Sequence, residues 1–451
     1  DELEHKVYER SFDPDETKEV RIYGQKGDDH IRITGDESLP IKIRVIGGKG
    51  QDTIDVAKGG GERVEVYKQT TQKDTFGFDG KVRLHQSKNP AIDAYNYREF
   101  KYEQTAPFLT GGYNLDDGIL LGVGVNIKRQ AFRKYPEASA QTISLGHALA
   151  TEAVFLRYKG RFNQLIGNSG LSVTSNFFLP NNTFNYFGQG NDTRFVKMGD
   201  KPIRFYRLRY DLIQTEALLD VKRSKVFNVS FGPTFQFFNL DRERNLDRFI
   251  TSGAPIDEDV FRSRLYGGLR LKATVDNRNS TTFPTRGVYW ENTIDGVKGL
   301  NDLSNDYLQL QSTFTLYTSL NDPARLVMAN RIGAGVQFGS PAFFQSLYLG
   351  GQGNLLGYRK NRFAGSRMLF HNIELRAKLF EFKTYLFPGS LGLIGFHDIG
   401  RVYVKNDQSD KWHTGYGGGI YISPANLVVI TAAVGHSGEE TLPYVTLGFR
   451  F

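Results

Sequence analysis

Few side chains in this sequence have the types and spacing that catalysis needs. The 451 residues include no cysteine, which excludes a disulfide framework, a thiolate nucleophile and a thiolate metal site. The eight histidines show no HExxH or comparable spacing. His397 and Asp398 are adjacent, but neighbours on a strand point to opposite faces and cannot form a catalytic pair. His436 and Ser437 lack a visible acidic partner. We therefore expect no catalytic residue in the barrel.

Two glycine-acidic turns could instead bind a metal ion. They span residues 24–31 and 47–54, and the second fits the calcium-binding nonapeptide of parallel β-rolls better than the first. Glycine permits tight left-handed turns, while Asp29 and Asp52 would supply hard oxygen ligands. These aspartates lie 23 residues apart, however, whereas β-rolls repeat about every nine residues. Two interpretations stay open: a calcium site at Asp29 and Asp52, or a small sheet with Gly-Asp turns.

A third segment, residues 349–365, combines loop composition with apolar side chains. It is rich in glycine and basic residues, which predicts a solvent-facing loop. It also contains Leu355, Leu356, Tyr358 and Phe363, which an exposed loop would not favour. We therefore expect the loop to fold back and pack against another part of the chain.

The elements that would position these residues are strands. No run of about 18 uninterrupted apolar residues is present, which excludes a helical membrane protein. From Phe108 onward, segments of about ten residues alternate between apolar and polar, and we count 16 of them. Their connections alternate between short and long, as in outer-membrane barrels. We predict an all-β fold: a 16-stranded antiparallel transmembrane β-barrel over residues 105–451, with an inward-folded loop and a small β-rich domain over residues 1–104.

An even number of strands places both ends of the barrel on the short-turn side, so we expect the N-terminal domain in the periplasm. In the last strand, Val445, Leu447, Phe449 and Phe451 alternate with polar residues and share one face. An aromatic residue after such alternation resembles the recognition signal of outer-membrane proteins. We expect Gly448, Phe449 and Phe451 to lie at a poorly paired seam between the first and last strands.

The order of several motifs resembles one family. The 349–365 loop and the strand that follows it, the 276–287 strand-turn-strand segment and the 396–400 segment are similar to the bacterial surface-antigen superfamily of outer-membrane assembly and translocation barrels. This superfamily includes the Bam- and Tam-type assembly barrels and the two-partner secretion transporters. The resemblance spans roughly residues 108–451 and implies insertion of proteins into, or translocation across, the outer membrane, without a nucleotide or metal cofactor. The N-terminal domain departs from the family, because no amphipathic helix like those of its polypeptide-transport domains is visible.

The resemblance also implies a role for the loop. In the family, a loop arginine pairs with acidic residues of the barrel wall, and the matching acids here are Glu374 and Asp398. The matching loop position is Leu356, followed by Gly357 and Tyr358, so the usual ion pair cannot form. Two alternatives are open. Either Arg359 or Arg362 replaces the missing arginine, or the apolar side chains hold the loop and both arginines are solvated.

The expected partners follow from the family and from charge. The net charge of +8 favours an anionic partner, which for an outer-membrane protein is lipopolysaccharide phosphate. No compact basic-aromatic motif favours nucleic acid. We expect outer-membrane lipid, unfolded or translocating client proteins and accessory lipoproteins as partners.

Two other functions are open. The N-terminal domain resembles the segment that joins calcineurin-like phosphoesterase domains to such barrels in Bacteroidetes-type proteins, and the sequence starts without a signal segment, as a processed chain or a piece of a longer one would. The barrel could therefore anchor or export an enzyme. A passive pore is the third possibility.

Overall fold

The computed structural model divides the chain into two units, Asp1–Tyr102 and Glu103–Phe451. It describes residues 6–35, 40–57, 63–97, 101–134, 136–167, 169–197, 199, 202–222, 224–254, 258–385, 387–405, 408–425 and 427–451. Among these residues, no helix is both long and apolar enough to cross a membrane.

The N-terminal unit is a stack of parallel strands in two sheets. One sheet has the order β1 (Glu19–Lys26), β3 (Lys42–Lys49), β5 (Val64–Gln69) and β7 (Arg83–Ser87), and the other has β2 (His30–Ile33), β4 (Thr53–Val56) and β6 (Thr75–Phe78). A short 3-10 helix, η2 (Pro90–Ile92), follows. Alternating apolar side chains from both sheets, such as Val45 and Ile54, form its buried core. The two Gly-Asp turns predicted from the sequence connect consecutive strands of this stack.

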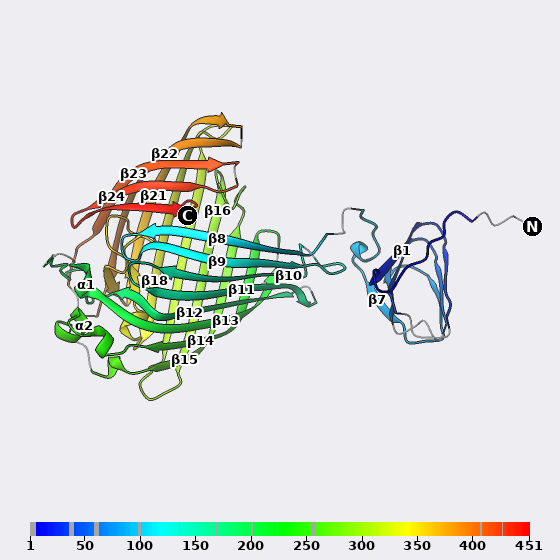
Figure 1. Cartoon of the computed structure of the whole chain (residues 1–451), viewed down its shortest axis with the longest axis horizontal. Helices are drawn as coiled ribbons and strands as arrows, with labels where there is room; N and C mark the ends of the chain where they lie inside the picture. Colours follow the sequence, from blue (N-terminus) through cyan, green and yellow to red (C-terminus); the bar gives the residue numbers. More distant parts are fainter. Residues whose placement is uncertain are drawn as a thin grey trace, which may run out of the picture. The chain divides into compact units, whose positions relative to one another are not determined.

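The second unit is a closed antiparallel barrel of 16 strands (Figure 1). In chain order these are β8 (Gln104–Asn114), β9 (Gly118–Arg129), β10 (Ser139–Ala148), β11 (Ala153–Ile166), β12 (Ser169–Asn185), β13 (Arg207–Lys222), β14 (Phe227–Asn239), β15 (Arg264–Asp276), β16 (Gly287–Gly299), β17 (Tyr307–Ser319), β18 (Leu326–Gly339), β21 (Arg367–Lys383), β22 (Pro388–Tyr403), β23 (His413–Pro424), β24 (Ile430–Ser437) and β25 (Thr441–Leu447). The predicted fold class is confirmed.

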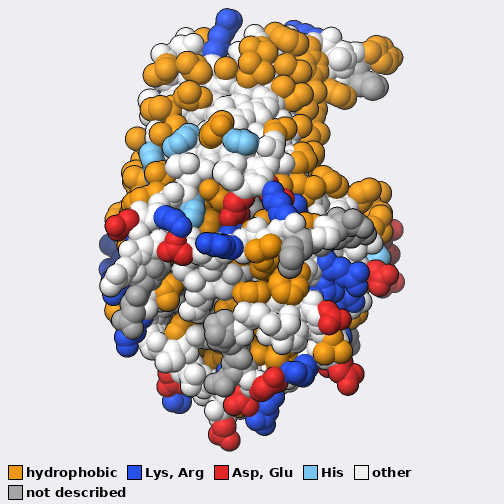
Figure 2. Space-filling model, turned by 90° about the vertical axis from the view of Figure 1, so that its left-hand side faces the viewer, with side chains coloured by type: hydrophobic (Ala, Val, Ile, Leu, Met, Phe, Trp, Pro, Cys, Tyr) orange, Lys and Arg blue, Asp and Glu red, His pale blue; other side chains and the backbone are white. Residues whose placement is uncertain are grey.

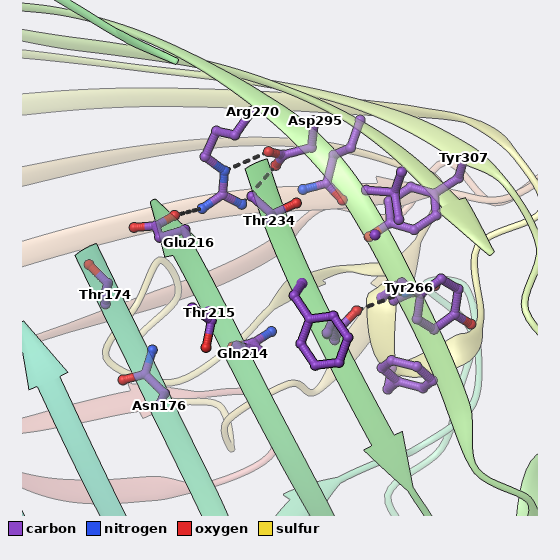
Figure 3. A pocket seen from close by; sticks show the side chains of 17 residues that line it. Thr174, Asn176, Gln214, Thr215, Glu216, Thr234, Tyr266, Arg270, Asp295 and Tyr307 are labelled. Carbon is purple, nitrogen blue, oxygen red and sulfur yellow. Dashed lines mark hydrogen bonds and ion pairs between the residues drawn. The ribbon is translucent and has the colours of Figure 1, made fainter. Parts of the chain in front are cut away.

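The alternation along the strands separates an apolar outer surface from a polar interior. Leu269 and Leu271 of β15 are exposed on the outside, whereas Arg270 between them points inward. Figure 3 shows Arg270 between two inward carboxylates: Nη1 lies 2.6 Å from Glu216 of β13, and Nε lies 2.5 Å from Asp295 of β16. These pairs balance opposite charges that face the partly accessible barrel interior.

Long connections gather at one end of the barrel. They contain α1 (Ile203–Tyr206), α2 (Phe249–Ser252) and the 3-10 helices η3 (Glu243–Asn245) and η4 (Glu258–Phe261), and Figure 2 views the end where α1 and α2 lie. Ile250 of α2 packs in a buried cluster with Leu208 of β13 and Phe343 of the loop between β18 and β21. We call this end of the barrel the long-loop end.

Candidate functional site

The loop between β18 and β21, which we call the inserted loop, folds into the barrel. It contains η5 (Phe343–Gln345) and a small hairpin of β19 (Leu347–Leu349) and β20 (Phe363–Gly365). The four apolar residues singled out from the sequence are all buried, and Leu355, Tyr358 and Phe363 pack in one cluster with Phe370 of β21 and Val402 of β22. Burying these side chains against the wall fixes the loop in place.

The tip of the inserted loop runs directly against the wall. Gly357 has a φ of +88°, and a Cβ atom there would lie 2.7 Å from the backbone of His436 in β24. A Cβ on Gly415 of β23 would lie 1.8 Å from the carbonyl oxygen of Leu356. Glycine is needed at both positions for this approach. The hydroxyl of Ser437 donates a hydrogen bond to the Gly357 carbonyl at 2.7 Å.

Asp398 joins the inserted loop to the wall. Its carboxylate is fully buried and accepts hydrogen bonds from the backbone N–H of Leu356 and from the side chain of Asn372 in β21, both at 2.8 Å. The guanidinium of Arg450 adds two more, at 2.5 and 2.7 Å. This buried carboxylate is therefore saturated with donors, including one full positive charge.

Glu374 has a different arginine partner from the one expected. Its Oε1 lies 2.7 Å from Nε of Arg376 on the same strand, and its Oε2 lies 3.9 Å from Nε of Arg450. Arg376 and Glu374 are each only 1% exposed, so the pair is fully desolvated. Arg450, beyond the last strand, thus supplies the guanidinium that family resemblance assigns to the loop.

Neither loop arginine reaches Glu374 or Asp398, so the expectation that Arg359 or Arg362 replaces the missing loop arginine is wrong. The other alternative is confirmed in part: the apolar side chains pack the loop against the wall, but both arginines are paired with acids and not solvated. The Arg362 side chain is fully buried and pairs with Glu439 at 2.6 Å. It also donates to the hydroxyl and carbonyl of Thr193, both at 2.7 Å. The physical reason is the path of the hairpin, which turns both side chains toward the loop end of β24 and β25.

Arg359 connects two turns on opposite sides of the barrel closure. Its guanidinium lies 2.7 Å from Glu440 in the turn between β24 and β25, and 3.5 Å from Asp116 in the turn between β8 and β9. The phenol of Tyr444 in β25 also accepts from the Gly357 N–H at 3.0 Å. We call this set of contacts the seam clasp.

The closure itself, between β8 and β25, is a weak seam. One register pair, Val445 with Tyr113, links the two strands, although the structure describes every backbone position of both. On their other sides, β8 forms eleven register pairs with β9, and β25 forms seven with β24. The edge of β8 over residues 104–112 therefore has no ladder partner on the side of β25.

The residues expected at the seam lie past the last strand. β25 ends at Leu447, and Gly448 has a φ of +96°, which breaks the alternation. Phe449 then packs on Phe283 and Tyr421, with ring centroids at 5.0 and 5.1 Å, while Arg331 lies 4.3 Å from the Phe451 ring. The expectation that Phe449 and Phe451 share a face with Val445 and Leu447 is wrong, because the turn at Gly448 directs them inward.

In the N-terminal unit, Asp29 and Asp52 stack on successive turns. Asp52 accepts a hydrogen bond from the Asp29 N–H at 3.1 Å, and the second carboxylate oxygen of each residue is buried without a partner. Burial, followed by the charges of Asp74, Asp29 and Asp28, raises the pKa of Asp52. Among the described residues, no group of three or more metal-binding side chains gathers. The calcium site stays a prediction.

Sequence reasoning missed several residues of the site. Glu439 and Glu440 lie in the short turn between β24 and β25, and no feature of the sequence other than their charge indicates that they belong to the site. Asn372, which supports Asp398 and accepts from Arg331 at 2.7 and 3.0 Å, carried no signal beyond its place on a predicted strand. Arg450 lies on the polar side of the alternation near the C-terminus of the sequence, but nothing local in the sequence indicates Asp398 as its partner.

Comparisons with known proteins identify the family. Residues 156–447 match the model of the Omp85 superfamily domain. The structure is similar to BamA from Haemophilus ducreyi lacking POTRA domains 1-3, with a TM-score of 0.54 and 13% identity over 85% of this chain and 74% of that one. CdiB from Escherichia coli gives a TM-score of 0.49 and 13% identity over 76% and 61%, and CdiB from Acinetobacter baumannii gives 0.46 and 14% over 76% and 59%. No curated protein matches the chain in sequence. Because the family match covers more than half of its length, the chain belongs to the Omp85 superfamily of outer-membrane β-barrels.

Proposed function

We propose that this protein inserts other proteins into the outer membrane, or moves them across it, at the seam between β8 and β25. The observation that carries the proposal is the single register pair that joins these strands. Each unpaired backbone N–H or C=O group costs on the order of several kcal/mol in the hydrocarbon layer of the membrane. A client strand that pairs with the free edge of β8 would satisfy them.

The inserted loop fits this function as a restraint on the seam. Arg359 binds Glu440 beside β25 and Asp116 beside β8, so one side chain spans the closure at the long-loop end. Charge-assisted contacts of this kind hold geometry well, yet they are weaker than a full ladder of backbone hydrogen bonds. The seam can therefore open without unfolding either strand.

In the orientation that we propose, the N-terminal unit and the short turns face the periplasm, and the long loops face outward. The partners would be outer-membrane lipid and lipopolysaccharide, unfolded or translocating client proteins, and accessory lipoproteins. The barrel itself would need no catalytic group. The positions of His397 and Asp398 fit this proposal, since His397 is exposed on the outer surface while the buried Asp398 is hydrogen-bonded to Arg450.

Depletion of the protein in its native cell tests the proposal. Quantitative proteomics of purified outer membranes should show the loss of a defined set of outer-membrane or secreted proteins, with their unfolded forms accumulating in the periplasm. Expression of the intact gene should restore that set. An unchanged outer-membrane proteome together with loss of a surface phosphoesterase activity would contradict the proposal and favour the anchor function. An unchanged proteome with altered solute permeability would favour a passive pore.

A further inference from the structure

A cavity of about 500 Å³ at the long-loop end is lined by an unusual number of arginines. They come from four separate segments: α1, the start of β13, the residue before α2 and the inserted loop. The five arginines are Arg204, Arg207, Arg209, Arg248 and Arg359. Asp116 is the only carboxylate among the described residues that line the cavity. Lys and Arg side chains are also visible on this end of the barrel in Figure 2.

Three of these arginines lack a neutralising partner. Within the described part of the chain, no carboxylate lies within 4.0 Å of Arg204, Arg209 or Arg248. The side chain of Arg209 donates to the amide oxygen of Asn181 at 3.1 Å, and Arg248 donates to the backbone carbonyl of Arg204. Burial, and then the positive charges of its arginine neighbours, lower the pKa of Arg248. The cavity therefore carries a concentrated positive potential.

The other two arginines share a single acid at the cavity wall. Arg207 lies 3.4 Å from Asp116, and Arg359 lies 3.5 Å from the same oxygen while its shorter contact is with Glu440. Asp116 and Glu440 together balance Arg207 and Arg359, so the excess positive charge of the cavity comes from Arg204, Arg209 and Arg248.

Among the described residues that line the cavity, two buried polar groups have no hydrogen-bond partner. Thr151 is only 4% exposed, and its hydroxyl is unsatisfied; the Nε of Arg207 is unsatisfied as well. Buried polar atoms nearly always have partners, so an orphaned group calls for a missing water, ion or ligand. A water molecule could satisfy the hydroxyl, but it would leave the charge of the arginines uncompensated.

We propose that this cavity binds a phosphate group. A phosphate monoester carries about −1.5 to −2 charges at neutral pH and offers three acceptor oxygens. Its oxygens match the planar fork of arginine, which binds them in pairs. A single carboxylate offers one charge and two oxygens, too few for three unneutralised arginines and a free hydroxyl.

The phosphate could belong to a lipid headgroup, such as a lipopolysaccharide phosphate, or to a soluble molecule. Both share the chemistry that the arginines recognise. The inference goes beyond the proposed function and does not depend on it, because anion binding is measured without any client protein.

Isothermal titration of the purified full chain with inorganic pyrophosphate tests the site, in a zwitterionic detergent and a phosphate-free buffer of low ionic strength. We expect saturable binding that weakens as salt is added. Arg209→Gln and Arg248→Gln should each weaken binding at least about tenfold, since hydrogen bonds to charged groups are the stronger class. Thr151→Val, which removes only the unpartnered hydroxyl, should weaken it about three- to tenfold.

Arg262→Gln is the matched control. Arg262 is an exposed arginine at the same end of the barrel, with 64% of its side chain accessible, and it does not line the cavity. Its replacement should leave pyrophosphate affinity unchanged. Absence of saturable binding would overturn the proposal, as would equal affinity of wild type, Arg209→Gln and Thr151→Val. Equally tight binding of acetate would also overturn it, since the site would then not select phosphate. Thr151→Val keeps the test valid if an arginine variant fails to fold.

A second arm separates the two sources. The protein is placed in phosphatidylcholine nanodiscs with or without bisphosphorylated lipid A, and pyrophosphate binding is measured again. If the natural ligand is a lipid headgroup, lipid A should block pyrophosphate binding in wild type, and the block should be lost in Arg209→Gln. If the ligand is soluble, pyrophosphate should bind equally well in both discs. Either result supports a phosphate site and assigns its source.

Discussion

Replacing Arg450 by methionine should destabilise the barrel strongly. The side chain of Arg450 is 8% exposed and that of Asp398 is 0% exposed, and two hydrogen bonds of 2.5 and 2.7 Å join them. Methionine keeps much of the volume but removes the charge, which leaves the Asp398 carboxylate with two neutral donors, the Leu356 N–H and the Asn372 amide. Breaking a buried ion pair from one side costs about 3–5 kcal/mol, and the remaining donors place this case near about 3 kcal/mol.

The assay is a double-mutant cycle with Asp398→Asn. Urea unfolding in lipid vesicles can be followed by tryptophan fluorescence, because both tryptophans, Trp290 and Trp412, belong to the barrel unit. The double variant buries no charge at this position, so it should recover much of the loss and give a coupling energy of about 2 kcal/mol or more. Arg286→Met, which breaks an exposed 3.5 Å pair with Asp322, should cost less than about 1 kcal/mol. The reasoning would be refuted if Arg450→Met lowered the unfolding free energy by less than about 0.5 kcal/mol. It would also be refuted if Arg450→Met lowered the unfolding free energy by the same amount in the Asp398→Asn background as in wild type.

Three further outcomes are expected. Arg359→Gln removes the charge that joins Glu440 to Asp116. Two cysteines placed across the seam should therefore form a disulfide more slowly in Arg359→Gln than in the same cysteine variant that keeps Arg359. Gly357→Ala forces a side chain into a φ of +88° and against the wall of β24, and should lower the unfolding free energy by more than about 1 kcal/mol in the same urea assay, where an unchanged midpoint would contradict the close approach. In the N-terminal unit, burial alone would raise the pKa of Glu65, but hydrogen bonds from Lys42 and Tyr67 and the charge of Arg44 lower it to about 2. A lowered pKa stabilises the fold above the unfolded value of about 4.5 and loses that effect as the pH falls toward 2. The protection factors of the β5 amides, which are corrected for the intrinsic pH dependence of exchange, should therefore fall over this window in wild type and much less in Glu65→Gln.

Much of the barrel could be predicted because lipid imposes a simple rule on each strand. Apolar residues such as Leu269 and Leu271 must face outward, and the polar residue between them must face the interior, so the period of two appears in the sequence. The same reasoning found the inserted loop, since Leu355 and Phe363 have no reason to stand in an exposed loop.

The partners of the charged residues could not be predicted, because barrel closure determines them. Arg362 and Glu439 lie 77 residues apart in the sequence, and nothing local signals that the loop hairpin directs one toward the other. The inward direction of Phe449 depends on one backbone angle at Gly448, which glycine permits but does not require. In the N-terminal unit, the spacing of 23 residues between Asp29 and Asp52 equals one full turn of the parallel stack, a period that a comparison with shorter β-roll repeats does not reveal.

Locking the seam tests the central claim most directly. The chain has no cysteine, so Tyr113→Cys with Val445→Cys introduces a single disulfide at the one register pair between β8 and β25. Opposed residues of antiparallel strands lie about 4.5–5.5 Å apart at Cα, within the range that a disulfide spans. Leu310→Cys with Val336→Cys, between β17 and β18, is the matched control because that ladder is already continuous.

The measurement is the restoration of client proteins in depleted cells by each variant, oxidised and reduced. The account predicts that the oxidised seam variant fails, that its reduced form works, and that the control works in both states. Full restoration by the oxidised seam variant, with the cross-link verified on the folded protein, would contradict a function that depends on opening between β8 and β25.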